Sequence, residues 1–150
     1  QTQLQLARHP QIQGVKECAG DLDQLQTLID DSPDDFAVFS GDDDQTMEYV
    51  RRGAKGVVSV VSNILPREVK EFLNSCVGGN LDQAQVLQDE LSPLFHGVLA
   101  LESNPQPIKT LMAIEGYCEE IFRSPMTRME EINRVKLQEL WSQYKSQTTP

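Results

Sequence analysis

Phe36-Ala37-Val38-Phe39 is the middle one of three short apolar runs within the first 63 residues. The other two are Ile12 to Lys16 and Gly56-Val57-Val58-Ser59-Val60-Val61. Each run is bounded by turn-forming residues and shows no polar face, which is typical of a strand covered on both sides of its sheet. We therefore predict three buried strands at these positions.

Helical patterns separate the three runs. Asp21 to Ile29 repeats leucine and isoleucine at helical spacing, and Asp44 to Arg52 places Met47 and Val50 on one face in the same way. Gly53 follows at a position where helices commonly end. Strands about 20 residues apart with a helix between them form βα repeats, so the sheet should be parallel with right-handed crossovers.

Helices alone are predicted after the third run. Pro66 can open one in its first turn, and Gly78-Gly79-Asn80 ends it. Further helical stretches cover residues 81–101, 105–117 and 129–141, and residues 147–150 are expected to be frayed.

The predicted elements are too few for a closed barrel. Three parallel strands cannot close, whereas a complete (β/α)8 barrel needs about 250 residues. The chain has 150 residues, lacks an initiating Met and begins at Gln1 with a helix-like segment. We therefore expect an α/β chain cut from something longer, with the content of the last three βα units of such a barrel and an added helical layer.

Composition excludes several classes of function. The net charge is −10, from 23 acidic and 13 basic residues, so the surface should repel nucleic acid and anionic membranes. Cys18, Cys76 and Cys118 are far apart, with no C-x-x-C motif, which predicts neither a zinc site nor a disulfide framework but reduced thiols in a cytoplasmic protein. No stretch approaches the roughly 20 apolar residues of a membrane span, and no signal peptide opens the sequence.

Lys16 is the leading candidate for chemistry, because it lies at the end of the first predicted strand. The carboxyl ends of parallel strands face the active site in α/β folds, and an amine held there in a dry, enclosed space would have its pKa lowered. A neutral amine can attack a ketone and form a Schiff base. A solvated loop lysine, or one half of an ion pair, is the structural alternative.

Other candidates have structural interpretations beside the functional ones. In Ser40-Gly41-Asp42-Asp43, the glycine allows the backbone to approach a ligand, while Asp43 is placed to cap the helix expected from Asp44. The two prolines of Glu102 to Lys109 predict a rigid entry into a helix. Cys18 is expected to be a buried, inert neighbour of Lys16. Ser59, Ser62, His9 and His96 have no catalytic partner in the sequence.

Four segments in register resemble the dihydrodipicolinate synthase family, from Gly14-Val15-Lys16-Glu17-Cys18-Ala19-Gly20-Asp21 to Ser124-Pro125-Met126. The resemblance implies that residues 1–65 correspond to barrel strands 6–8, and that residues 66–150 form the last barrel helix and a C-terminal helical region. The matching segments are Lys16-Glu17-x-x-Gly20, Phe39-Ser40-Gly41-Asp42-Asp43, Gly56-Val57-Val58-Ser59-Val60 with Asn63, and Asn104-Pro105-x-Pro107-x-Lys109.

The resemblance also implies a reaction. Lys16 would form an imine with pyruvate, and the derived enamine would attack aspartate semialdehyde to give 4-hydroxy-tetrahydrodipicolinate, a step toward lysine and diaminopimelate. The backbone carbonyl of Val58 would lie beside the bound pyruvate, and Gly41 would line the pocket. Neither a metal nor an organic cofactor is implied, and the parent would be a homo-oligomer, a dimer or a tetramer.

The sequence departs from the family in lacking everything N-terminal to the lysine segment. The family's acid/base tyrosine, tandem threonines and substrate arginine belong to that missing part, and losing one member of a proton relay already costs about 10²–10⁴ in rate. We therefore expect residues 1–150 alone to be inactive. The alternatives are a non-catalytic, self-associating half-barrel, and a related class I aldolase acting on N-acetylneuraminate or a 2-keto-3-deoxy sugar acid.

Overall fold

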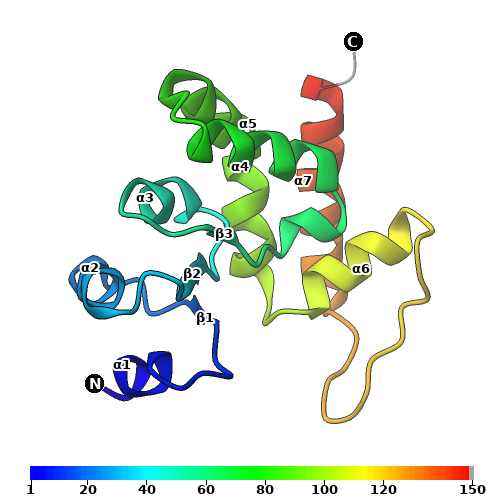
Figure 1. Cartoon of the computed structure of the whole chain (residues 1–150). Coiled ribbons are helices and arrows are strands. Elements are labelled where there is room, and N and C mark those ends of the chain that lie inside the picture. The colour runs from blue at the N-terminus through cyan, green and yellow to red at the C-terminus, as the bar shows by residue number, and fades with distance from the viewer. Residues whose placement is uncertain (149–150) are drawn as a thin grey trace.

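The sheet is parallel and three-stranded, in the order β1-β2-β3, in the computed structural model, which describes residues 1–148 (Figure 1). Val15 pairs with Val38, and Phe39 pairs with Gly56. The parallel βα repeat predicted from the sequence is confirmed. The strands are β1 (Gly14–Glu17), β2 (Ala37–Ser40) and β3 (Gly56–Val57).

Three helices accompany the strands: α1 (Thr2–Ala7), α2 (Leu22–Asp31) and α3 (Thr46–Arg51). Asp21 begins α2, because its carboxylate accepts hydrogen bonds from the backbone N–H groups of Asp23 and Gln24 at 3.0 Å each. Gly53 follows α3 with φ +116°, as predicted for a residue just past a helix end.

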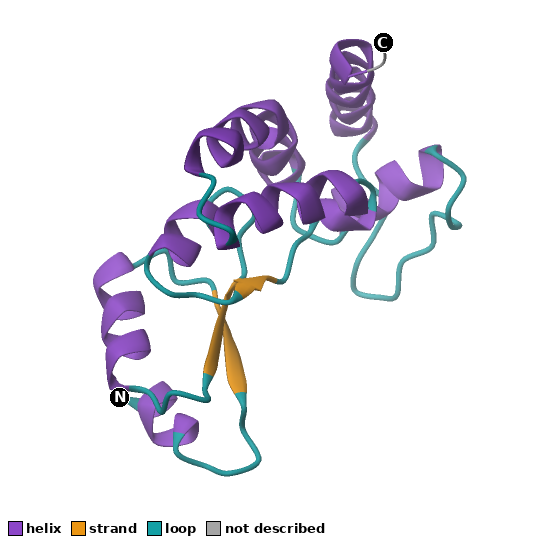
Figure 2. Cartoon of the chain, turned by 45° about the horizontal axis from the view of Figure 1, so that its top comes forward, coloured by secondary structure: helices purple, strands orange, loops and turns teal. Residues whose placement is uncertain are grey.

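The prediction that the strands are covered on both faces is wrong. Along β2, Val38 and Ser40 are buried while Ala37 and Phe39 are only partly buried, an alternation typical of a sheet with one packed face. Figure 2 shows α1 and α2 on one side of β1 and β2, where Val38 packs with Leu25, Leu28 and Tyr49. The opposite face of β2 is only partly covered within the described residues.

The third predicted strand is much shorter than its apolar run. β3 ends at Val57, and Val61–Asn63 form a short 3-10 helix, η1. The difference arises because the backbone N–H groups of Val60 and Val61 bond to the side chain of Asp43 instead of to a neighbouring strand. Apolar periodicity could not reveal that partner.

The second half is helical, as predicted. α4 begins at Pro66, and Gly78 to Asn80 separate it from α5. The last helix starts later than expected and continues to Thr148, so the predicted fraying of residues 147 and 148 is wrong; residues 149–150 lie outside the described part of the chain. The helices are α4 (Pro66–Val77), α5 (Leu81–Leu101), α6 (Gln106–Ile114) and α7 (Glu131–Thr148).

These helices enclose the larger hydrophobic core. Phe72 of α4 and Phe95 of α5 are almost fully buried, with ring centroids 5.8 Å apart. Leu137 and Trp141 of α7 complete the same core. Among residues 1–148, no helix is both long and apolar enough to cross a membrane.

Candidate active site

Lys16 lies on β1 and lines an open cavity of about 430 Å³. The loop after β3 forms one wall of this cavity, and α6 with its preceding segment forms another. Segments far apart in the sequence therefore meet around one amine. The lining residues are Lys16, Val58, Ser59, Val60, Asn63, Asn104, Pro105, Ile108, Lys109, Met112 and Cys118.

Gly41, which directly follows β2, is buried against the Lys16 side chain. A β-carbon at position 41 would lie 2.7 Å from Lys16 Cε and 1.9 Å from Cys18 Sγ. Either contact is too short for a real carbon, so only glycine fits without displacing its neighbours. The close approach expected of Gly41 is thus made to Lys16 itself.

Val58 extends the site from the third strand. Its backbone N–H donates to the Ser40 carbonyl oxygen at 2.8 Å, which fixes the start of the loop after β3 beside the end of β2. The side chain is 49% exposed and lines the cavity with Lys16. The three residues selected from the sequence, Lys16, Gly41 and Val58, are therefore neighbours in space.

Two expectations about the surroundings of Lys16 are wrong. Lys16 is exposed rather than held in a dry, enclosed space, because the loop after β3 and α6 wall the cavity on only part of its perimeter. Cys18 is also exposed rather than buried, because it lies beyond the end of β1, where its sulfur packs beside Gly41. Within residues 1–148, the site is an open half-cavity.

Asp43 does not cap α3, contrary to the sequence-based prediction. That helix begins at Thr46 after Gln45, which makes no side-chain capping bond. The Asp43 carboxylate instead accepts from the backbone N–H groups of Val60 at 2.9 Å and Val61 at 3.0 Å. The side chain joins the loops that follow β2 and β3.

The cavity has a positive lining in an otherwise acidic chain. Within the described part, it includes Lys16 and Lys109 but no carboxylate. The Lys109 amine donates to the Ile121 carbonyl oxygen and lies 5.4 Å from the centre of the Phe122 ring. A positive, partly apolar cavity favours a small anion, such as a carboxylate, over a cation.

The charge of Lys16 also acts on the carboxyl of Asp42, which follows Gly41. Burial raises the pKa of its carboxyl, the negative charge of Asp44 raises it further, and the positive charge of Lys16 opposes the rise. The neighbouring carboxylates therefore make the full ionisation of this loop unfavourable, while the amine of Lys16 offsets part of the repulsion.

The segment before α6 contributes more than its sequence suggested. Its two prolines lie at the start of α6, as the interpretation of a rigid helix entry requires. The same segment also brings Asn104, Ile108 and Lys109 to the cavity that contains Lys16. Nothing in the local sequence shows that this segment lies at a cavity with a residue nearly 90 positions earlier. The asparagine and the lysine on either side of the two prolines could have indicated a loop with a polar, functional surface.

Metal ligands do not gather at this site. Among the described residues, no group of three or more His, Cys, Asp or Glu side chains is placed to hold a metal ion. All three cysteines are free thiols.

Comparisons with known proteins agree on one family. Residues 1–144 match the model of the dihydrodipicolinate synthetase family. The 4-hydroxy-tetrahydrodipicolinate synthase of Thermodesulfovibrio yellowstonii is 39% identical over 93% of this chain, and that of Methanospirillum hungatei is 40% identical over 93%. Each match covers 48% of the relative, so the chain spans about half the length of the curated relatives it matches.

Solved structures give the same result. The dihydrodipicolinate synthase of Aquifex aeolicus superposes with a TM-score of 0.91 at 37% identity, over 96% of this chain and 49% of that one. The chloride-inhibited enzyme of Acinetobacter baumannii, solved with pyruvate, gives 0.88 at 32% identity, over 95% and 49%. The three parallel strands thus match part of the barrel of these enzymes.

Proposed function

Because the chain belongs to the dihydrodipicolinate synthetase family, we propose that it is the C-terminal half of a pyruvate-condensing lyase with Lys16 as its Schiff-base nucleophile. Residues 1–65 would then supply barrel strands 6–8, and residues 66–150 the last barrel helix with the C-terminal helical region. The observation that carries the proposal is that Lys16 and Val58 line one cavity while Gly41 packs against the Lys16 side chain.

The chemistry follows from the nucleophile. The Lys16 nitrogen attacks the keto carbon of pyruvate, and the keto oxygen leaves as water, which gives an imine. Loss of a methyl proton turns the imine into an enamine, whose terminal carbon forms a bond to the aldehyde carbon of the second substrate, and the aldehyde oxygen takes up a proton to become a hydroxyl. The amino group of the second substrate then attacks the imine carbon, which closes the ring, breaks the bond to the Lys16 nitrogen and releases the free amine. Gly41 leaves room for the Lys16 side chain itself, and the Val58 carbonyl would lie beside the bound keto acid.

The proposed second substrate is aspartate semialdehyde, and the proposed product is 4-hydroxy-tetrahydrodipicolinate. Support comes from relatives that are named 4-hydroxy-tetrahydrodipicolinate synthase at 39% and 40% identity. The positive lining supplied by Lys16 and Lys109 suits two anionic substrates. We propose a homo-oligomer, a dimer or a tetramer, as the form of the complete enzyme.

Activity should require the half of the barrel that residues 1–150 do not contain. Lys16 is exposed here, so solvent reaches its amine. A complete chain, meaning residues 1–150 joined to the remaining half of the length of the relatives, would close the cavity. Residues 1–150 alone are expected to release no product.

Reductive trapping tests the proposal. The complete chain is incubated with pyruvate and borohydride, and mass spectrometry of its peptides locates the adduct. We expect the adduct on Lys16 and none in Lys16→Ala. Lys55→Ala is the matched control, because Lys55 is also exposed but precedes β3 and so lies at the opposite end of the parallel sheet. An adduct on a different lysine would overturn the mechanism.

A further inference from the structure

Asp43 is a buried carboxylate with an unusual set of partners. The residue is only 3% exposed, and one oxygen, Oδ2, accepts both the Val60 and the Val61 backbone N–H groups. The other oxygen, Oδ1, is buried and makes no hydrogen bond within the described residues. Burying a carboxylate costs free energy unless it is hydrogen-bonded. The two bonds to the loop after β3 offset that cost, and bonds to a carboxylate are stronger than bonds between neutral groups.

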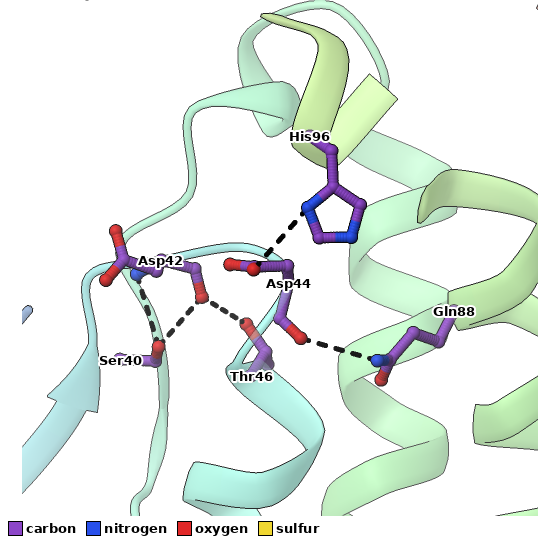
Figure 3. A network of polar contacts seen from close by, with 6 residues as sticks. All are labelled: Ser40, Asp42, Asp44, Thr46, Gln88 and His96. Atoms are coloured by element: carbon purple, nitrogen blue, oxygen red, sulfur yellow. Dashed lines mark hydrogen bonds and ion pairs between the residues drawn. The ribbon is translucent and has the colours of Figure 1, made fainter. Parts of the chain in front are cut away.

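The loop that carries Asp43 is itself held on both sides (Figure 3). On one side, the Asp42 carbonyl oxygen accepts from the Ser40 hydroxyl at 2.8 Å and from the Thr46 hydroxyl at 3.1 Å. On the other side, α5 contacts Asp44: the Gln88 amide donates to the Asp44 carbonyl oxygen at 3.3 Å, and His96 Nδ1 lies 3.6 Å from the Asp44 carboxylate. The backbone on both sides of Asp43 is therefore held in place, and this fixes the position from which its side chain extends.

The segment that Asp43 holds is the wall of the Lys16 cavity. Val58, Ser59, Val60 and Asn63 all line that cavity, and β3 ends at Val57. At its start, the wall is held to β2 by the bond from the Val58 backbone N–H to the Ser40 carbonyl oxygen. Beyond Val58, its other bonds are local, such as the one that Ser59 Oγ accepts from the Ser62 backbone N–H at 2.8 Å. Without Asp43, the wall would lose its two bonds to the loop after β2 in this region.

We propose that Asp43 is a positioning residue that sets the Val58–Asn63 wall, and with it the Val58 carbonyl, at the distance from Lys16 that the reaction needs. This inference rests on the proposed function, because it assigns a task within the same site. Asp43 touches no reacting atom; it acts through the two backbone amides that it binds.

A purely structural role is the competing explanation, and α2 offers a matched control. Asp21 also accepts two backbone N–H bonds with one carboxylate oxygen, at the start of a helix that does not line the cavity. Asp21→Ala therefore removes the same kind of bonds at a residue that does not line the cavity. If Asp43 only stabilises the fold, Asp43→Ala and Asp21→Ala should behave alike.

The experiment measures the limiting rate of borohydride trapping at saturating pyruvate in the complete chain, with folding checked by circular dichroism. Asp43→Ala should lower this rate by about 100-fold, since a displacement near 1 Å at a reacting group can cost that much. Asp43→Asn keeps an oxygen that can accept both bonds, so its trapping rate should be at least about tenfold higher than that of Asp43→Ala. Asp21→Ala should stay within about threefold of the unaltered chain.

Hydrogen exchange in residues 1–150 gives a second readout, independent of any chemistry. The Val60 and Val61 amides should exchange at least about tenfold faster in Asp43→Ala than in Asp21→Ala. Unchanged trapping in a folded Asp43→Ala variant would overturn the inference, as would an equal loss in Asp21→Ala. Failure of the unaltered complete chain to form any Lys16 adduct would instead overturn the proposed function, so the two failures are distinguishable.

Discussion

Gly41 and Lys16 are so close that a β-carbon at position 41 would lie 2.7 Å from Lys16 Cε. The contact joins the loop after β2 to the end of β1, so the space beside Lys16 depends on the absence of a side chain at its neighbour. This relationship makes Gly41 a direct test of the site.

Gly41→Ala should therefore impair both the fold and the site. The added methyl would displace Lys16 or Cys18, and overpacking of this kind typically costs about 1–3 kcal/mol of unfolding free energy. In the complete chain, we expect borohydride trapping of pyruvate to fall at least about tenfold. Urea unfolding and adduct mass measure the two effects.

Gly79→Ala is the control for that substitution. Gly79 has φ +75°, so alanine is strained there, but no atom lies within 4 Å of its added carbon. The control should lose stability by about 1 kcal/mol and leave trapping unchanged. Equal trapping by Gly41→Ala and the control would show that the close contact is irrelevant to the site.

The cysteines should react with an alkylating reagent in a defined order. Burial raises the pKa of the Cys76 thiol to about 11, so it remains protonated and slow near neutral pH. Cys18 is exposed and should be modified first. Timed quenching followed by peptide mass spectrometry checks the order, and early labelling of Cys76 would contradict the buried position of α4.

Asp42→Asn should stabilise the fold at neutral pH but not in acid. Burial and the neighbouring Asp44 raise the pKa of the Asp42 carboxyl above 3.8 in the folded chain, so the folded state binds a proton more readily than the unfolded one. Stability from this group is present below the unfolded pKa and is lost as the pH rises through the folded value. Removing the charge of Asp42 should therefore raise the stability of the fold only at pH values above this titration range.

Urea unfolding at several pH values provides the measurement for Asp42→Asn. Asp34→Asn serves as the control, because Asp34 is an exposed residue in the turn before β2. A gain in stability that is the same for Asp42→Asn in acid and at neutral pH would contradict the electrostatic cause.

Phe72→Ala should destabilise the helical half strongly. Phe72 is 0% exposed and packs against Phe95, and removing a buried phenylalanine typically costs about 3–5 kcal/mol. Val77 is 60% exposed at the end of the same helix, so Val77→Ala should lower the free energy of unfolding by less than about 0.5 kcal/mol. Thermal and urea unfolding compare the two, and similar losses would argue against the packing of α4 on α5.

Local signals were enough to place most of the elements. Pro66 at the start of α4 and Gly53 after α3 act within a few residues of themselves, so their effects appear directly in the sequence. The third strand was overextended, because the apolar character of Val58 to Val61 carries no information about the Asp43 carboxylate that binds their backbone.

The sequence by itself determined the alternation of strands and helices, the parallel sheet, and the candidacy of Lys16 and Gly41, since periodicity, turn residues and strand ends are local properties. Val58 was selected from the resemblance to the dihydrodipicolinate synthase family. Only the tertiary structure decided that Lys16 and Cys18 are exposed, that Asn104 and Lys109 line the same cavity as Lys16, and that Asp43 binds the loop after β3. The physical reason is distance along the chain. Burial and hydrogen-bond partners depend on which remote segments pack together, and that is settled by the total free energy of the folded chain rather than by any short stretch of it.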